Sequence, residues 1–143
     1  MEIGKVPNEL LEEIVFKNIT HKREEVLVRA SIGEDTAIMD LGEDLCVLST
    51  DPITGATKEL GALAIHISCN DIATRGAEPI GVLLTVLCPE GTTEEELNTV
   101  MADAGRAAES VNVEIIGGHT EVTDGVNRII LSTTVIGRMK RQK

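Results

Sequence analysis

Residues 60–79, LGALAIHISCNDIATRGAEP, decide how the rest of the chain is arranged. Their first two-thirds are small and apolar on nearly every face, which is typical of a buried helix. Asn70 and Asp71 interrupt this apolar run, and Gly76 ends it. A carboxylate inside a buried helix needs a charged partner or a metal ion, because burial of an isolated charge is costly. Asp71 is therefore a candidate functional residue. The alternatives are a place on a narrow exposed strip or a cap on a neighbouring loop.

The segments on both sides of this helix predict a layered fold. Helical spacing or a capping signal marks residues 8–18 and 93–110. Strand-like patterns mark residues 26–28, 36–40, 45–49, 79–88, 113–116 and 128–137. This order favours an α+β two-layer sandwich, with one mixed or antiparallel sheet and helices on one face. The apolar run at 79–88 does not alternate, which predicts a strand covered on both faces, with another subunit on one side.

Length and charge limit the function classes. A chain of 143 residues suits one domain, and we assign residues 1–143 to it. Its net charge of −11 disfavours nucleic-acid binding, which needs clustered lysines and arginines. Phe16 is the only aromatic residue, so aromatic rings that stack on bases are also lacking. The excess of carboxylates instead favours hard divalent cations such as Mg²⁺.

The cysteines and the hydropathy indicate a reduced, soluble protein. Cys46, Cys69 and Cys88 are widely spaced in apolar runs, which fits buried thiols rather than a disulfide framework or a zinc site. The first ten residues, MEIGKVPNEL, do not have the pattern of a signal peptide. Because no apolar stretch reaches the length of a membrane span, we expect a cytoplasmic protein without a membrane partner.

Three aspartates occur in the same local context. Asp35, Asp51 and Asp71 each lie at the end of an apolar element, beside a residue that controls backbone shape. Three carboxylates that converge at one rim of a sheet would bind one or two Mg²⁺ ions, with water and phosphate oxygens as the other ligands. The alternative for Asp35 and Asp51 is an ordinary surface turn.

A second group of candidates follows the predicted strand 113–116. Gly117 and Gly118 allow the backbone to approach either another chain segment or the phosphates of a ligand. His119 and Glu121 stand in what we predict to be a strand-end loop, and His119 is the best acid–base candidate, although a loop histidine is more often structural or solvated. Lys5, near the N-terminus, is either a solvated residue or a lysine that folds over a phosphate.

Four ordered motifs carry a family resemblance. They are Gly33-Glu34-Asp35-Thr36-Ala37, Ser49-Thr50-Asp51, Asn70-Asp71-Ile72-Ala73 with Gly76-Ala77-Glu78-Pro79, and Gly117-Gly118-His119-Thr120. Together they resemble the N-terminal domain of the aminoimidazole ribonucleotide (AIR) synthetase superfamily. The form Gly-Gly-His-Thr-Glu-Val is most similar to the hydrogenase expression/formation branch, the carbamoyl dehydratases.

The resemblance implies an ATP- and Mg²⁺-dependent reaction in which a substrate oxygen or phosphate is phosphorylated. Asp35, Asp51 and Asp71 would then bind the metal and the nucleotide, with Asn70 and Lys5 also at the nucleotide. Gly117, Gly118 and Thr120 would orient its phosphates. His119 and Glu121 would be the catalytic residues. The resemblance also implies a homodimer that pairs through the sheet, and a second, C-terminal domain that this chain does not contain.

Three functions are consistent with these patterns. The first is an ATP-using enzyme domain most like the hydrogenase maturation dehydratase, and a small-molecule kinase of the thiamine monophosphate kinase type is a variant of it. The second is a catalytically silent dimerisation module. The third is a regulatory domain that binds a small molecule or a metal ion. The motifs do not identify the phosphate acceptor, and the C-terminal cysteine that the dehydratase branch uses is absent from this sequence.

Overall fold

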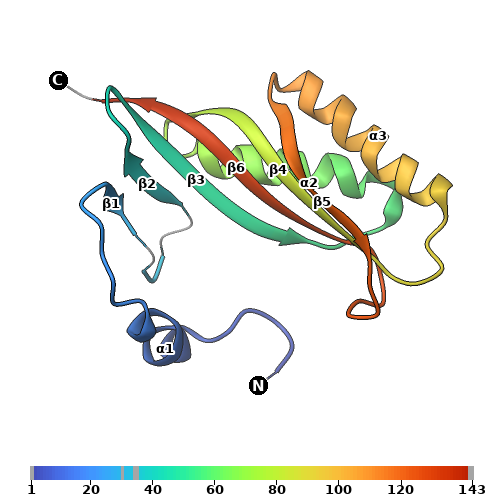
Figure 1. Cartoon of the computed structure of the whole chain (residues 1–143), viewed down its shortest axis with the longest axis horizontal. Coiled ribbons are helices and arrows are strands. Elements are labelled where there is room, and N and C mark those ends of the chain that lie inside the picture. The colour runs from blue at the N-terminus through green and yellow to red at the C-terminus, as the bar shows by residue number, and fades with distance from the viewer. Residues whose placement is uncertain (1, 30, 34–35, 142–143) are drawn as a thin grey trace.

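A single mixed sheet forms the centre of the fold (Figure 1). The computed structural model describes residues 2–29, 31–33 and 36–141. The sheet has the strand order β1-β2-β3-β6-β4-β5, and only the pair β4 and β5 is parallel. The strands are β1 (Val26–Val28), β2 (Ala37–Asp40), β3 (Asp44–Ile53), β4 (Glu78–Cys88), β5 (Glu114–Val122) and β6 (Ile130–Lys140).

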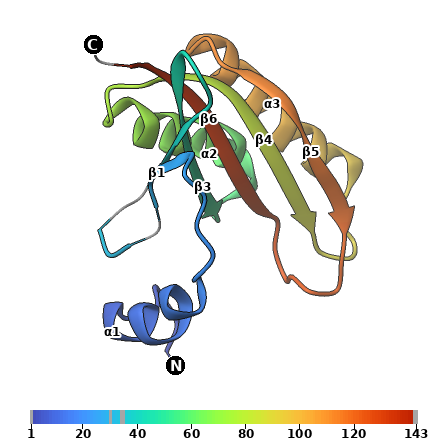
Figure 2. The ribbon, with the colours of Figure 1, turned by 60° about the vertical axis from the view of Figure 1, so that its left-hand side comes forward.

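Two long helices, α2 (Thr57–Ala73) and α3 (Glu94–Ser110), cover one face of this sheet (Figure 2). Burial alternates along the central strands, as it must when only one face is covered. In β6, Leu131, Thr133 and Val135 are fully buried, while the residues between them are only half-buried. The predicted α+β sandwich with helices on one face is therefore confirmed.

The helix pair is held by small residues and by a capped N-terminus. Thr93 and Glu96 form a reciprocal capping box at the start of α3, with their backbone N–H groups bound to each other's side chains. In α2 the backbone at Lys58 and Glu59 is not helical, so the regular helix begins at Leu60. Gly61 then faces Val100 and Ala104 of α3 so closely that a Cβ atom would lie 2.1 Å from the Val100 carbonyl oxygen.

The N-terminal helix has the predicted extent but an irregular form. It consists of α1 (Asn8–Leu10), a π-helical turn η1 (Leu11–Val15) and a 3₁₀ turn η2 (Phe16–Asn18). None of its residues is buried. Short helices take most of their stability from packing an apolar face, and this segment packs little of its apolar surface.

Two strands extend further than the sequence predicts. Residues 50–53 lie inside β3 rather than after it, because β6 offers an antiparallel partner to every residue of β3. Residues 117–121 lie inside β5, paired with β4, and the predicted strand-end loop is therefore wrong. Local sequence marked both segments as turns, and pairing with distant strands overrode that preference.

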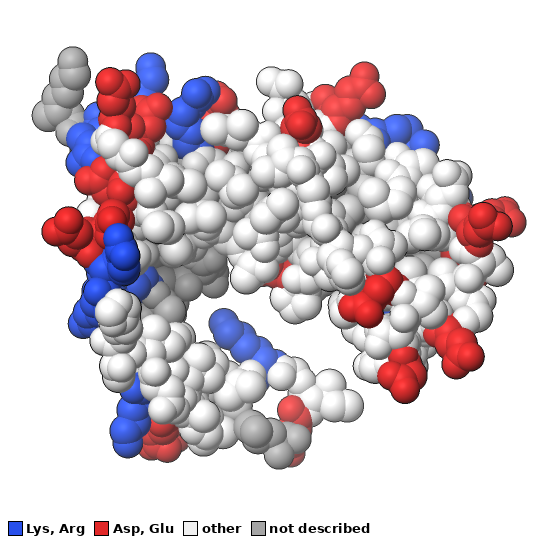
Figure 3. Space-filling view, in the orientation of Figure 1, with Lys and Arg blue, Asp and Glu red and all other residues white. Residues whose placement is uncertain are grey.

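The face of the sheet opposite the helices is open in this chain. Within one chain, residues 79–88 are covered on one face only: Leu83 is 40% exposed between the buried Val82 and Leu84, and Ile80 is 43% exposed. The predicted subunit on the other face stays a prediction. Figure 3, in the orientation of Figure 1, shows that the middle of this face is largely free of charged residues, which gather at its margins. An unpartnered apolar surface of this kind is typical of an interface.

Candidate functional site

A seam of polar side chains lies between the sheet and the second half of α2. Ser49 and Asp51 lie on the helix-covered side of β3, on the same face as the buried Val47 and Ile53. The Ser49 hydroxyl donates to the Asp71 carboxylate, with Oγ 3.5 Å from Oδ2. Two predicted site residues, Asp51 and Asp71, therefore face the same seam. Residues i and i+2 of a strand are about 7 Å apart, so Asp51 lies about 7 Å along β3 from Ser49, the residue that bonds to Asp71.

Two buried hydroxyls that the motifs did not indicate complete this polar seam, which we define as Ser49, Asp51, Ser68, Asp71 and Thr133. The Ser68 and Thr133 hydroxyls are hydrogen-bonded to each other, and both residues are almost completely buried. Thr133 is the register partner of Asp51 and donates from Oγ1 to its carbonyl oxygen at 3.4 Å. No short motif could have identified Thr133, because it becomes a neighbour of Asp51 only through β3–β6 pairing.

The hydrogen bond between Ser68 and Thr133 should be measurable as a coupling energy. Ser68→Ala or Thr133→Val alone leaves a buried hydroxyl without its partner, which costs about 1–3 kcal/mol. The double variant should lose about 1 kcal/mol less than the sum of the two single losses. The free energies of unfolding of the two single variants and the double variant can be measured by urea unfolding, followed by circular dichroism. Thr134→Val, on the open face, is the matched control with a smaller loss, and strictly additive losses would contradict the bond.

The start of β2 is anchored near the last turn of α2. The Arg75 guanidinium donates from Nε to Oγ1 of the buried Thr36 at 2.7 Å. Arg75 lies in the turn directly after α2, so Thr36 lies near the end of the helix that carries Asp71. Asp35, which directly precedes Thr36, lies outside the described residues. The predicted convergence of all three aspartates consequently remains a prediction.

The residues of the glycine motif lie at the far edge of the sheet. Thr85 and Leu87 of β4 pair with His119 and Glu121, which places both side chains on the open face. The His119 Nε2 and Glu121 Oε1 atoms are 3.5 Å apart, and both side chains are at least half exposed. β5 is three strand positions from β3, about 14 Å away. One chain alone does not bring His119 and Glu121 to Asp51 and Asp71.

The sequence left open whether Gly117 and Gly118 allow the backbone to approach another chain segment or a ligand. At Gly118, φ is +147° and a Cβ atom would lie 1.9 Å from the Leu84 carbonyl oxygen. Glycine is thus required at this position for β5 to approach β4. The close approach to another chain segment is shown here, and Thr120 follows in the same strand, paired with Val86.

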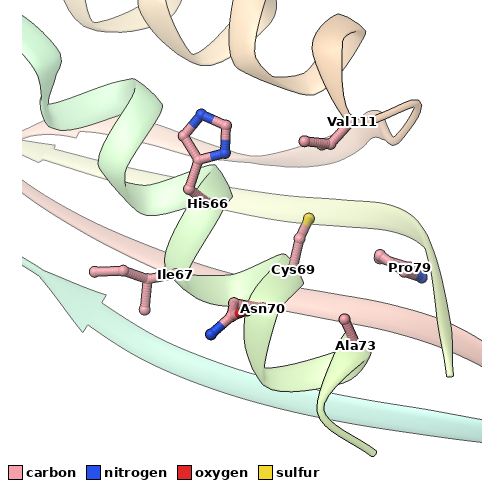
Figure 4. A pocket seen from close by; sticks show the side chains of 7 residues that line it. All are labelled: His66, Ile67, Cys69, Asn70, Ala73, Pro79 and Val111. Carbon is pink, nitrogen blue, oxygen red and sulfur yellow. The ribbon is translucent and has the colours of Figure 1, made fainter. Parts of the chain in front are cut away.

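Asn70 and Lys5 are separate from the seam in this chain. Asn70 is exposed on the outer side of α2, where it borders a shallow cavity of about 540 Å³ together with His66, Cys69 and Pro79 (Figure 4). Consecutive helical residues point in directions about 100° apart, which explains why Asn70 and Asp71 diverge. Lys5 is exposed in the segment before α1, which Figure 1 shows apart from the sheet.

The seam contains only oxygen donors, which are the ligands that Mg²⁺ prefers. Within residues 2–29, 31–33 and 36–141, no three acidic, histidine or cysteine side chains come together closely enough to hold a metal ion. The described part of the chain therefore supplies two of the three predicted carboxylates.

The three cysteines are free, as the sequence predicts. Cys69 and Cys88 are buried and Cys46 is half-buried, and burial raises the pKa of each thiol. A raised pKa lowers the thiolate fraction, which makes these side chains unreactive core residues. In the described part of the chain, no helix has both the length and the apolar character needed to cross a membrane.

Comparison with known proteins places this arrangement in a family. The chain is 34% identical to a putative hydrogenase expression/formation protein of Methanocaldococcus jannaschii, over 98% of this chain and 43% of that protein. The crystal structure of a HypE–HypF complex matches with a TM-score of 0.72 and 30% identity, over 92% of this chain and 43% of that one. The hydrogenase maturation protein HypE in complex with ATP matches with a TM-score of 0.64 and 25% identity, over 97% and 42%.

The chain spans less than half the length of these relatives. The family model described as AIR synthase related protein, N-terminal domain, matches residues 33–139, which include the polar seam and β5. The resemblance inferred from the motifs is confirmed, and the chain belongs to the AIR synthase related protein family, as its N-terminal domain.

Proposed function

We propose that this chain is an ATP- and Mg²⁺-dependent enzyme domain that activates a substrate oxygen by phosphorylation, most like the hydrogenase maturation dehydratases. The observation that carries the proposal is the polar seam. There Asp51 of β3 and Asp71 of α2 lie on facing sides of the contact between the strand and the helix, with Ser49 bonded to Asp71. A related protein of similar fold, HypE, was solved in complex with ATP. Two carboxylates and several hydroxyls form a donor set suited to a hard cation.

In this proposal each motif has a defined task. Asp51 and Asp71, together with Asp35, hold Mg²⁺, which when bound neutralises charge on the phosphates. The Ser49 hydroxyl donates to the Asp71 carboxylate, and Thr133, bonded to Ser68, holds the backbone carbonyl of Asp51. These bonds keep both residues in place, so that little reorganisation is needed when the metal binds. Asn70 and Lys5 contact the nucleotide.

In the proposal, β5 contributes to the nucleotide and substrate site from the open face of the sheet. The backbone of Gly117 and Gly118 and the hydroxyl of Thr120 orient phosphates, and His119 exchanges a proton with the substrate. Glu121, whose Oε1 atom is 3.5 Å from the His119 Nε2 atom, orients the imidazole. Because this face is separate from the seam in one chain, the proposal requires a second copy that faces the open side of the sheet. The exposed Ile80 and Leu83 and the uncharged centre of that side support a homodimer.

The test is calorimetric titration of ATP, with and without Mg²⁺, into this chain and its variants. Asp71→Asn should weaken Mg²⁺-dependent binding at least tenfold and leave the circular dichroism spectrum unchanged, since only one charge is removed. Asp44→Asn is the matched control, because Asp44 is an exposed residue at the opposite end of the same strand as Asp51. Equal affinity of wild type and Asp71→Asn would contradict the site.

The alternative is a dimerisation module without catalysis, favoured by the open apolar face. It predicts a dimer in sedimentation and no response to ATP and Mg²⁺. If the wild-type chain is dimeric but does not bind ATP, the same titration with a protein that spans the full length of the relatives separates the two functions. Binding by the longer protein supports the enzyme, and no binding supports the module.

A further inference from the structure

A cavity of about 200 Å³ lies at the junction of the N-terminal helix and the sheet, away from the polar seam. Its lining comes from the end of that helix, the segment between the helix and β1, the first residue of β1 and the residue that follows β1. The lining residues are Phe16, Ile19, His21, Lys22, Arg23, Val26 and Arg29. We call this cavity the N-terminal basic pocket.

The charge of the N-terminal basic pocket is opposite to that of the protein. The chain as a whole carries −11, yet the lining contains Lys22, Arg23 and Arg29 and no carboxylate. Glu25, which pairs with Arg23 from outside the lining, offsets one of the three positive charges. The remaining excess of two positive charges around one small cavity attracts a dianion more strongly than a monoanion.

Two of the three cationic groups are already held in place. The Arg23 guanidinium donates from Nε and from a terminal nitrogen to the two carboxylate oxygens of Glu25, at 3.1 and 2.8 Å. This bidentate pair raises the pKa of Arg23 and leaves its other N–H groups for a further acceptor. The Arg29 guanidinium donates to the Val26 carbonyl oxygen at 2.6 Å. Side chains that are fixed before binding lose less entropy when a ligand arrives.

The size of the cavity restricts the ligand. Sites for drug-sized ligands commonly enclose about 300–1,000 Å³, so a cavity of about 200 Å³ does not enclose a nucleoside triphosphate. A phosphate group with a short ester fits this volume, and a phosphomonoester carries close to two negative charges at neutral pH. Phe16, Ile19 and Val26 supply an apolar wall on which a small organic group can lie.

We propose that the N-terminal basic pocket binds a small phosphomonoester, with the phosphate between Lys22, Arg23 and Arg29 and the organic part against Phe16 and Ile19. The proposal does not depend on the proposed ATP site. The pocket involves the β1 edge of the sheet, and Asp51 lies beyond β2 and near the opposite end of β3.

Phenyl phosphate, inorganic phosphate and benzoate serve as probes, because they separate the contributions of the dianion and the ring. In a titration of the full chain followed by nuclear magnetic resonance, phenyl phosphate should bind saturably and shift the amide signals of residues 16–29. It should bind more tightly than inorganic phosphate, which lacks the ring, and than benzoate, which carries one charge. Weak, non-saturating shifts with all three probes would overturn the proposal.

Variants with matched charge test the assigned residues. Lys22→Ala and Arg29→Ala should each weaken phenyl phosphate binding about tenfold, since each removes a charge-assisted hydrogen bond. Lys17→Ala removes the same charge from an exposed residue of η2 that does not line the pocket. The affinity of this variant for phenyl phosphate should equal that of the wild-type chain. Equal losses in Lys17→Ala and Lys22→Ala would show a general charge effect and overturn the site.

The same variants keep this proposal distinct from the ATP proposal. Asp71→Asn should retain phenyl phosphate binding, and Lys22→Ala should retain any Mg²⁺-dependent ATP binding that the wild-type chain has. Loss of phenyl phosphate binding in Asp71→Asn would overturn the N-terminal basic pocket as an independent site, whatever the outcome for ATP.

Discussion

Gly118→Ala should lower the free energy of unfolding by about 3 kcal/mol or more, because the added Cβ atom has no space. It would lie 1.9 Å from the carbonyl oxygen of Leu84 and 2.8 Å from its backbone nitrogen. Both are backbone atoms of a central strand, and they cannot move aside as a side chain can. The positive φ of +147° adds strain for any residue with a Cβ.

The adjacent glycine provides the control for this prediction. At Gly117 φ is also positive, at +159°, so backbone strain is common to both variants. A Cβ atom there would meet only the Leu83 Cδ2 atom, at an ordinary 3.5 Å, so Gly117→Ala should cost clearly less. Because the chain has no tryptophan or tyrosine, urea unfolding is best followed by far-ultraviolet circular dichroism. Hydrogen exchange should show β5 losing protection first in Gly118→Ala. Equal stability of the two variants would contradict the close approach of β5 to β4.

Gly61→Ala should have an effect of similar size, about 3 kcal/mol, at the contact between α2 and α3. Here the added Cβ atom would lie 2.1 Å from the Val100 carbonyl oxygen and 2.7 Å from the Ala104 nitrogen. Val100 and Ala104 are both fully buried, so the helices must separate and their shared core must loosen. The higher helix propensity of alanine, worth about 1 kcal/mol, offsets only part of this loss.

Gly105→Ala is the matched control, because Gly105 is in α3 but exposed, with no atom within 4 Å of an added Cβ. This variant should gain about 0.5–1 kcal/mol from helix propensity alone. The midpoint of urea unfolding for Gly61→Ala should therefore fall while that for Gly105→Ala rises. If both variants rise, the two helices are not in the close contact described here.

The sequence was most informative where a local pattern coincides with a local structural need. The capping signal at the start of the predicted helix 93–110 is the capping box of Thr93 and Glu96 that begins α3. The ordered aspartate and glycine motifs identified the family before any coordinates, and the match over residues 33–139 agrees. Each of these features depends on residues close together in the chain.

The sequence did not predict where the strands end or which face of the sheet or helix each side chain occupies. Asp51 precedes a proline and has turn-like neighbours, yet it lies inside β3 because β6 pairs with it from about eighty residues away. His119 follows two glycines and was expected in a loop, yet it lies in β5 because β4 offers a parallel partner. Asn70 and Asp71 form one motif, but the helix directs them to different sides.

The sequence by itself therefore determined the α+β class, the order of the elements, the free state of the cysteines and the family. Only the tertiary structure decided that Asp51 and Asp71 share a seam with Ser68 and Thr133, and that His119 and Glu121 lie on the opposite face at the far edge. The physical reason is that helix capping, turns and periodicity are set by neighbouring residues. Strand register and facing are instead set by contacts between segments that are distant in the chain, and a shift by one residue would reverse them.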